Sequence, residues 1–222
     1  MLPIKKTRQP IELENAVRNI KITPDAQLTW NNIDGETKHA VMRSLLKEQG
    51  GLCAYCMRRI TSASGTVEHY IPQSRGKGTD DENSVDYKNL LAVCDGFSGC
   101  AAELTCDKAR GDAPLTVNPL KPETLTSIRY SRDGRILSDN ASVNHDLNDV
   151  LNLNQRLLVR NRAKVILEMS HRFQRLAQRK GDKAIGSFCE KYVKEHENDP
   201  SKRQEYDGVL IYFMKKRARH SA

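Results

Sequence analysis

The residues whose types and spacing could do chemistry lie between positions 53 and 107. Cys53 and Cys56 form a Cys-x-x-Cys pair, and Cys94 and Cys106 follow roughly forty residues later. Two pairs of thiols with such an interval can bind one Zn²⁺ ion tetrahedrally. We therefore predict a structural zinc site on these four cysteines, whose loops hold the residues between them in a small volume.

The second pair of ligands has an alternative. Cys100 lies in an insertion that contains Gly and Ser, and it could replace either Cys94 or Cys106. Disulfide bonds between these cysteines are a further alternative, although cysteines in a reducing compartment more often bind a metal. Cys189 stands alone in a predicted helix and is assigned to the core.

Polar residues that could take part in hydrolysis lie among these cysteines. Glu68 and His69 fall in residues 66–71, where β-forming residues after a Ser-Ala-Ser-Gly turn predict a strand. Asn89 begins a buried apolar segment, and its side chain offers both a donor and an acceptor. Asp107 read alone is a helix cap, but it directly follows a cysteine.

The elements that must position these residues follow from hydrophobic spacing, Gly and Pro. Gly50 and Gly51 stop a helix just before the first cysteine pair, and Asp133-Gly134 is a two-residue hairpin signal. The expected elements are an extended arm over 1–24, a helix over 36–49, a strand over 66–71, an exposed loop over 72–88, a buried segment over 89–93, a short helix over 107–110, a hairpin with strands 127–130 and 135–137, and helices from 154, over 184–196 and over 201–219.

Length and charge limit the possible classes. A chain of 222 residues can form one sizeable domain or two small ones without disulfides. No segment approaches the roughly 18 apolar residues of a membrane span, and residues 1–6 lack the apolar run of a secretion signal, so we expect a cytoplasmic protein without a membrane partner. Residues 154–222 carry 17 Lys and Arg against 8 Asp and Glu, a net charge of +9, whereas residues 1–153 carry 19 against 20, a net charge of −1. This surplus suggests a surface for phosphate backbone or an acidic partner, and the alternative is a solvated helix surface.

Four motifs together resemble an HNH endonuclease with a cysteine-bound zinc. They are GLCAYC at 51–56, VEHYIPQS at 67–74, NLLAVC at 89–94 and CDKARGD at 106–112. More narrowly, the chain resembles the PtuB-like HNH nucleases of Septu and retron-associated anti-phage systems. Each motif is weak alone, but four in the family's order are specific, and the likeness extends over most of the chain.

The resemblance implies a fold and a set of roles. It implies an α+β, mainly α protein, with a ββα-metal core, the zinc-binding cysteines, a small hairpin and a C-terminal helical region. His69 is then the general base, which a near-neutral imidazole suits. Glu68 and Asp107 are then the ligands of one catalytic Mg²⁺ or Mn²⁺. Asn89 ties the loop that orients the histidine, with Asn83 as a weaker alternative.

The expected domains are an N-terminal arm over 1–35, a zinc-stabilised nuclease domain over 36–153 and a basic helical region over 154–222. The resemblance implies a nucleic-acid substrate, DNA or RNA, and an ABC-type, SMC-like ATPase that binds and restrains the nuclease. In retron-linked systems it also implies a reverse transcriptase with its DNA–RNA product. The alternative from another class is a zinc-stabilised module that binds nucleic acid or protein without cutting it.

The last helix leaves one further choice open. Val209, Leu210, Tyr212 and Phe213 could pack inside the chain or against the partner, and helical stripes of this kind favour the internal position.

Overall fold

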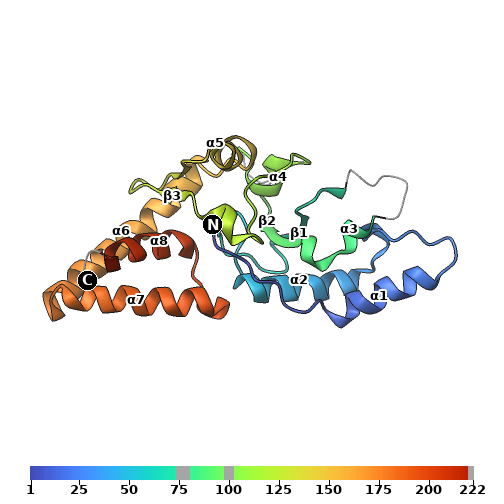
Figure 1. The fold of residues 1–222 in the computed structure, drawn as a ribbon, viewed down its shortest axis with the longest axis horizontal. Coiled ribbons are helices and arrows are strands. Elements are labelled where there is room, and N and C mark those ends of the chain that lie inside the picture. The colour runs from blue at the N-terminus through green and yellow to red at the C-terminus, as the bar shows by residue number, and fades with distance from the viewer. Residues whose placement is uncertain (74–80, 98–102, 220–222) are drawn as a thin grey trace.

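The computed structural model describes residues 1–73, 81–97 and 103–219. It is a mainly helical α+β protein with two small antiparallel sheets, elongated so that α1, α2, β1 and β2 lie in one half and α6, α7 and α8 in the other (Figure 1). The main elements are α1 (Ile11–Ile22), α2 (Gly35–Gln49), β1 (Gly65–His69), α3 (Glu82–Val85), β2 (Leu90–Cys94), α4 (Cys106–Arg110), β3 (Ile128–Tyr130), β4 (Ile136–Ser138), α5 (Ala141–His145), α6 (Arg156–Lys180), α7 (Lys183–Asn198) and α8 (Asp207–Arg219).

Helix α2 carries the chain to the first cysteine pair, as the spacing predicts. The Asp34 side chain accepts a hydrogen bond from the Thr37 amide at the start of the helix, and Gly50 ends it in the left-handed conformation at φ 68°. One face of the helix, which includes Val41 and Leu45, is fully buried.

Strands β1 and β2 pair antiparallel, with Glu68 opposite Leu91 and His69 opposite Leu90. All five residues of β2 are buried, which explains why its sequence is apolar throughout rather than alternating. The short helix α4 packs on β2 and ends at Gly111, as predicted. The sheet thus brings Glu68 and His69 close to the helix that begins with Cys106.

The predicted extended arm is wrong over residues 11–22, which form α1. Pro10 lies directly before the helix, where its missing amide hydrogen costs nothing, and Glu12 and Glu14 lie in the first turn. Leu13 is fully buried, and α1 packs against α2. The prolines that suggested an extended arm therefore flank a helix instead of preventing one.

Most other boundaries differ from the expectation by one or two residues, and two differences are larger. The predicted loop over 72–88 contains α3 and a 3₁₀ turn at Tyr87–Asn89. Helix α8 begins at Asp207 rather than 201, because residues Pro200–Lys202 form a 3₁₀ turn and Arg203 is extended. The side chain of Arg203 there donates to the carbonyl oxygen of His196 at 3.4 Å.

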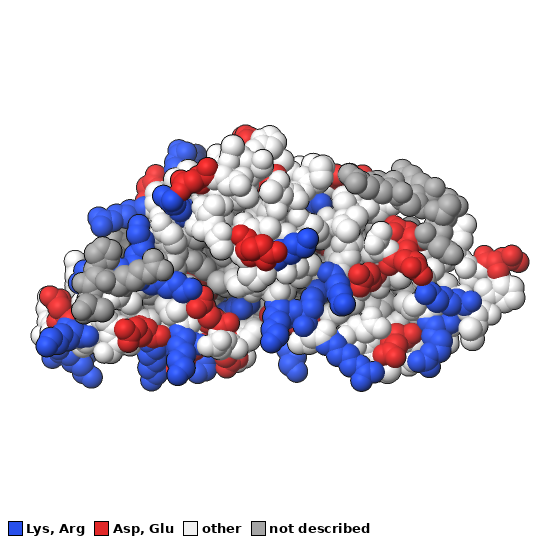
Figure 2. Space-filling model, in the orientation of Figure 1, with Lys and Arg blue, Asp and Glu red and all other residues white. Residues whose placement is uncertain are grey.

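The C-terminal helices pack on one another and bury most of the α8 stripe. Val209 and Leu210 are buried, which confirms the internal position for them, whereas Tyr212 and Phe213 are half-buried. Asp207 joins α7 to α8, since its carboxylate accepts hydrogen bonds from Tyr192 at 2.5 Å and His196 at 2.7 Å. Figure 2 shows Lys and Arg both over these helices and along the lower edge of the other half. No described helix is both long and apolar enough to cross a membrane.

The hairpin of β3 and β4 lies against α6 at its turn. Gly134, at φ 91°, comes so close that an added Cβ would lie 2.2 Å from the carbonyl oxygen of Val159. Arg162 of α6 is 1% exposed and donates to the Gly134 carbonyl at 2.6 Å and the Leu153 carbonyl at 2.7 Å. This guanidinium thus fixes the hairpin and the start of α6 together.

Replacing Arg162 should destabilise the whole chain. In Arg162→Met the two carbonyls lose their donors in a buried position, which we expect to cost about 2–4 kcal/mol. The exposed Arg160→Met on the same helix should stay within about 0.5 kcal/mol. Urea unfolding followed by circular dichroism measures both values, and equal effects of the two variants would contradict this role.

Candidate metal centre and active site

The first two cysteines lie in a tight turn after α2. The amide of Met57 donates to the carbonyl of Cys53 at 3.0 Å, and the amide of Cys53 donates to the carbonyl of Arg58 at 2.8 Å. Met57 has φ 64°, in the left-handed region that side chains adopt infrequently. These bonds fold the chain back on itself, so that Cys53 and Cys56 present their thiols to the same side.

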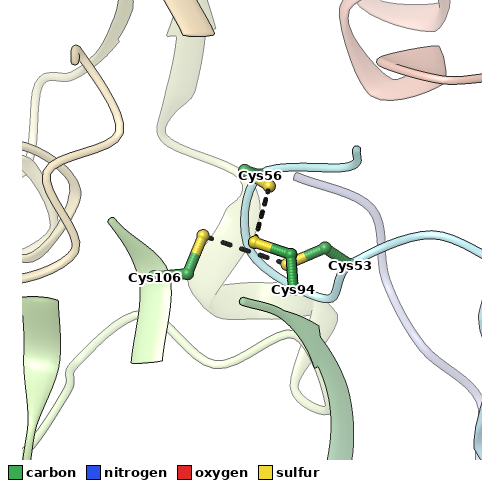
Figure 3. A group of neighbouring side chains, drawn as sticks. All are labelled: Cys53, Cys56, Cys94 and Cys106. Carbon is green, nitrogen blue, oxygen red and sulfur yellow. Dashed lines mark hydrogen bonds between the residues drawn. The ribbon is translucent and has the colours of Figure 1, made fainter. Parts of the chain in front are cut away.

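The four predicted zinc ligands come together as one buried cluster. Cys94 enters from the end of β2 and Cys106 from the start of α4, and all four sulfur atoms lie within 4.8 Å of one another (Figure 3). The Sγ atoms of Cys53 and Cys106 are 3.9 Å apart, and those of Cys56 and Cys94 are 3.7 Å apart. Four sulfurs at about 2.3 Å from a tetrahedral Zn²⁺ are about 3.8 Å from one another.

The donor set therefore fits zinc. The separations of 3.7 and 3.9 Å are far beyond the about 2.05 Å of a disulfide bond, and the four thiols are free. Burial raises the pKa of the Cys56 and Cys106 thiols, whereas hydrogen bonds from the neighbouring thiols lower the pKa of Cys94. A divalent cation supplies the charge that allows such buried groups to bind as thiolates. Cys100, the alternative ligand, lies outside the described residues.

The two ends of the segment between Cys94 and Cys106 are held next to each other. The amide of Thr105 donates to the carbonyl of Gly96 at 3.0 Å, and an added Cβ at Gly96 would lie 2.4 Å from the carbonyl oxygen of Thr105. Cys106 has φ 57°, and its amide donates to the carbonyl of Leu151 at 2.9 Å. A residue keeps such a strained backbone conformation only when several surrounding contacts hold it in place. The two hydrogen bonds of Thr105 and Cys106 are contacts of this kind.

Glu68 lies in a buried network beside the thiols. Its Oε1 atom accepts a hydrogen bond from the Tyr55 hydroxyl at 3.1 Å and forms an ion pair with Arg110, whose side chain is 1% exposed. Burial raises the pKa of Glu68 to about 8, with a further contribution from the neighbouring Asp107 and an opposing one from Arg110. Two carboxyl groups side by side favour a shared proton or a shared cation.

Arg110 is a residue of the site to which the sequence motifs assign no role. Besides Glu68 it donates to the carbonyl of Tyr70 at 2.6 Å and, through its Nε atom, to the carbonyl of Ala113 at 2.8 Å. It lies in the CDKARGD motif, three residues after Asp107, so both side chains leave the same side of α4. That helical spacing was the available signal.

His69 is held by contacts on both of its ring nitrogens. Nε2 lies 2.8 Å from the carbonyl oxygen of Ser84, which can only accept, so Nε2 carries the proton and donates. Nδ1 is then the acceptor, and the Gln73 amide nitrogen lies 2.8 Å from it. The indole of Trp30 packs edge-on at 5.4 Å between ring centroids. Burial lowers the pKa of His69, which favours the neutral imidazole.

Asn89 ties together two segments of the loop around the histidine. Its Oδ1 atom accepts from the amide of Ile71 at 2.7 Å, and its Nδ2 atom donates to the carbonyls of Ile71 at 3.0 Å and Asn83 at 2.9 Å. Asn83, the alternative residue, takes part in this contact with its backbone carbonyl oxygen. Among the described residues, the four thiols are the one group of three or more candidate ligands, so Glu68 and Asp107 form a pair rather than a larger cluster.

Zinc content tests the thiol cluster directly. We expect about one Zn²⁺ per purified chain, and Cys94→Ser should reduce it to below about 0.2 with loss of cooperative unfolding, because binding to such a site contributes about 10–16 kcal/mol. Cys100→Ser and Cys189→Ala should keep the metal. Elemental analysis and thermal unfolding measure these outcomes. Zinc-free wild-type protein, or loss of zinc in Cys100→Ser, would contradict the assignment.

Arg110→Met tests the ion pair beneath Glu68. Removing one partner of a buried pair leaves an uncompensated carboxyl group, so we expect a loss of about 3–5 kcal/mol in the free energy of unfolding at saturating zinc. The double variant Glu68→Gln with Arg110→Met should recover part of that loss. Lys108→Met, on the exposed side of α4, is the matched control. A loss in the control as large as that in Arg110→Met would show that the pair is not responsible.

Comparison with known proteins finds a distant relative. No model of a known protein family matches the chain. Over 140 residues the chain is 27% identical to a protein of Vibrio cholerae serotype O1 biovar El Tor named "Retron Vc95 putative HNH endonuclease". The match covers 61% of this chain and 65% of that protein, so the chain spans less than two thirds of the relative's length.

Proposed function

We propose that this chain is a metal-dependent HNH endonuclease that hydrolyses phosphodiester bonds in nucleic acid. The observation that carries the proposal is the position of His69 and Glu68 on one strand of a two-stranded sheet, next to the helix that bears Asp107. Two antiparallel strands followed by a short helix are the order of a ββα-metal core. The name of the Vibrio cholerae relative agrees with this function.

His69 is the proposed general base. Because Nε2 donates to the Ser84 carbonyl, Nδ1 keeps the lone pair that accepts a proton from the attacking water. The lowered pKa of His69 keeps this nitrogen unprotonated near neutral pH. The side-chain amide of Gln73 contacts Nδ1 in this structure. The attacking water must therefore displace this amide or bind to Nδ1 beside it.

Glu68 and Asp107 are the proposed ligands of the catalytic cation, Mg²⁺ or Mn²⁺. Cations of this kind are held by one or two protein carboxylates together with substrate phosphates and water. When bound, the cation would polarise the scissile phosphate and stabilise the departing oxygen. Arg110 and Tyr55 both contact Oε1 of Glu68 and thereby fix the carboxylate in place. Asn89 holds the loop that follows His69.

The biological setting is also a proposal. The resemblance to Septu and retron-associated nucleases supports an effector of anti-phage defence that an ABC-type, SMC-like ATPase restrains, with a reverse transcriptase and its DNA–RNA product in a retron-linked assembly. The word retron in the name of the relative agrees with the second setting. The surplus of Lys and Arg in residues 154–222 suits contact with a phosphate backbone.

Replacing His69 tests the catalytic assignment. Purified chain with Mg²⁺ or Mn²⁺ should cleave DNA or RNA to 5′-phosphate and 3′-hydroxyl ends. His69→Ala should lower the rate by about 10²–10⁴-fold while the zinc content stays unchanged. His39→Ala, on the exposed face of α2, should cleave like the wild type. Gel assays with end mapping measure these results.

One observation favours the alternative, a zinc-stabilised binding module that does not cut. The ion pair with Arg110 uses one carboxylate oxygen of Glu68, which a catalytic ligand would need to share. The same experiment separates the two functions. If neither the chain alone nor the chain with its ATPase cleaves DNA or RNA, and His69→Ala leaves phage defence intact, then the binding module is the correct function.

A further inference from the structure

The basic surplus of the C-terminal region is concentrated on one helix. Helix α6 contains eight Lys and Arg residues against a single acidic residue, Glu168. By contrast, α7 carries three Lys and three Glu, and α8 carries four Lys and Arg and one Asp. Most of the net charge of +9 of residues 154–222 therefore belongs to α6, a helix of 25 residues.

The exposed face of α6 carries arginines that have no partner in the described part of the chain. Four arginine side chains are exposed and form no ion pair or hydrogen bond with another described residue, namely Arg156, Arg160, Arg175 and Arg179. The acidic Glu168 is already paired, since it lies 3.9 Å from Lys164. We call these four arginines the arginine face, and their charges are available to an anionic ligand.

The dimensions of the arginine face match those of a DNA duplex. With about 100° of rotation and 1.5 Å of rise per residue, the four side chains spread over about 140° of the helix circumference and about 35 Å of its length. One turn of B-form DNA is about 34–36 Å long. Its major groove is about 12 Å wide, close to the 10–12 Å diameter of a helix. Such a face can contact phosphates on both edges of the groove along about one turn.

The composition of α6 disfavours other ligands. Single strands stack on aromatic side chains. Helix α6 has no Tyr or Trp, and its one Phe, Phe173, packs edge-on against Phe188 at 6.3 Å between ring centroids. A protein partner would need contiguous apolar area. Within α6, all of whose residues the structure describes, Leu167 is the one large apolar side chain that is exposed. Duplex RNA has a deep and narrow major groove that fits this face less well.

The first turn of α6 lies close to the helix that bears Asp107. The carbonyl of Leu151 accepts a hydrogen bond from the amide of Cys106 at 2.9 Å. The side chain of Asn152 donates to the carbonyl of Leu104 at 2.9 Å, and Asn152 is four residues before Arg156. Figure 1 shows α6 running from beside α5 and β3 to the end of the molecule where α7 begins. The arginine face therefore starts near α4.

We propose that the arginine face of α6 binds the phosphate backbone of double-stranded DNA and leads the duplex toward the proposed active site. Guanidinium groups suit this role, because they stay charged and can bind phosphate through two parallel hydrogen bonds. The inference rests on the proposed nuclease function for its purpose, but the binding itself does not require cleavage.

The salt dependence of DNA binding tests the arginine face. A fluorescein-labelled duplex of about 20 base pairs, about two turns, is titrated with the full zinc-loaded chain without added Mg²⁺ or Mn²⁺, and fluorescence anisotropy gives the Kd at several KCl concentrations. The triple variant Arg156→Gln, Arg160→Gln, Arg175→Gln should raise the Kd at least about tenfold near 0.1 M salt. It should also reduce the slope of log K against log salt by about 2–3, since each lost phosphate contact removes about 0.9.

Two further variants locate the effect. The triple variant Lys183→Gln, Lys191→Gln, Lys194→Gln removes the same charge from exposed positions of α7, and its slope should change by less than about 0.5. Lys in place of the same three arginines keeps the charge, and the slope should stay within the same limit. Circular dichroism and zinc content show that all three variants are folded.

Several results would overturn the inference. The arginine and lysine variants could lose affinity equally, or the wild-type chain could bind no duplex even at low salt. A single strand or an RNA duplex of the same sequence could bind more tightly than the DNA duplex and lose that affinity in the arginine variant, which would assign the face to that ligand.

Cleavage assays separate a failure of this inference from a failure of the proposed function. With Mg²⁺ added, the arginine variant should raise KM for duplex DNA at least about fivefold and change kcat less than about twofold, because it removes binding rather than catalysis. If the arginine variant cleaves and binds like the wild type, this inference fails while the nuclease function stands. If the wild type binds DNA through α6 but never cleaves it, the proposed function fails while this inference stands.

Discussion

The buried cluster of four thiols connects three separate segments of the chain. One pair lies in the turn after α2, Cys94 ends a five-residue strand and Cys106 begins a five-residue helix. A two-stranded sheet of this size is only marginally stable in water. A cation on the four sulfurs would therefore fix the positions of β2 and α4, and through the strand pairing the position of Glu68 and His69 as well.

Charge compensation is the second requirement of this region, because the thiols and carboxyl groups gather in a buried volume. Arg110 takes one oxygen of Glu68, and Arg162 lies where its positive charge acts on the Cys56 and Cys106 thiols. The helix α4 thus combines a thiol, a carboxylate and a guanidinium within five residues. Cys106 faces the cluster, while Asp107 and Arg110 interact with Glu68. A single short helix in this way joins the structural centre to the proposed catalytic one.

Sequence spacing predicts this region better than it predicts the ends of the chain. The cysteine pairs and the helix stop at Gly50 each follow from a local rule, and the structure agrees with both. The hairpin also forms where it was predicted, but its turn is longer than the predicted two residues, since Tyr130 pairs with Ile136. Tertiary contacts decide the rest. Helix α1 forms because Leu13 is buried against the body of the protein, and Arg110 belongs to the site because folding brings β1 beside α4.

The hydrogen bond from Thr105 to Gly96 has a consequence for how the chain tolerates change in length. It closes the base of the segment between Cys94 and Cys106, so the positions of these two cysteines do not depend on how many residues lie between Gly96 and Thr105. Closing a longer loop costs only about 0.6 kcal/mol for each doubling of its length. Insertions there should leave both centres in place, which makes this segment a suitable point for a reporter tag or for divergence among relatives.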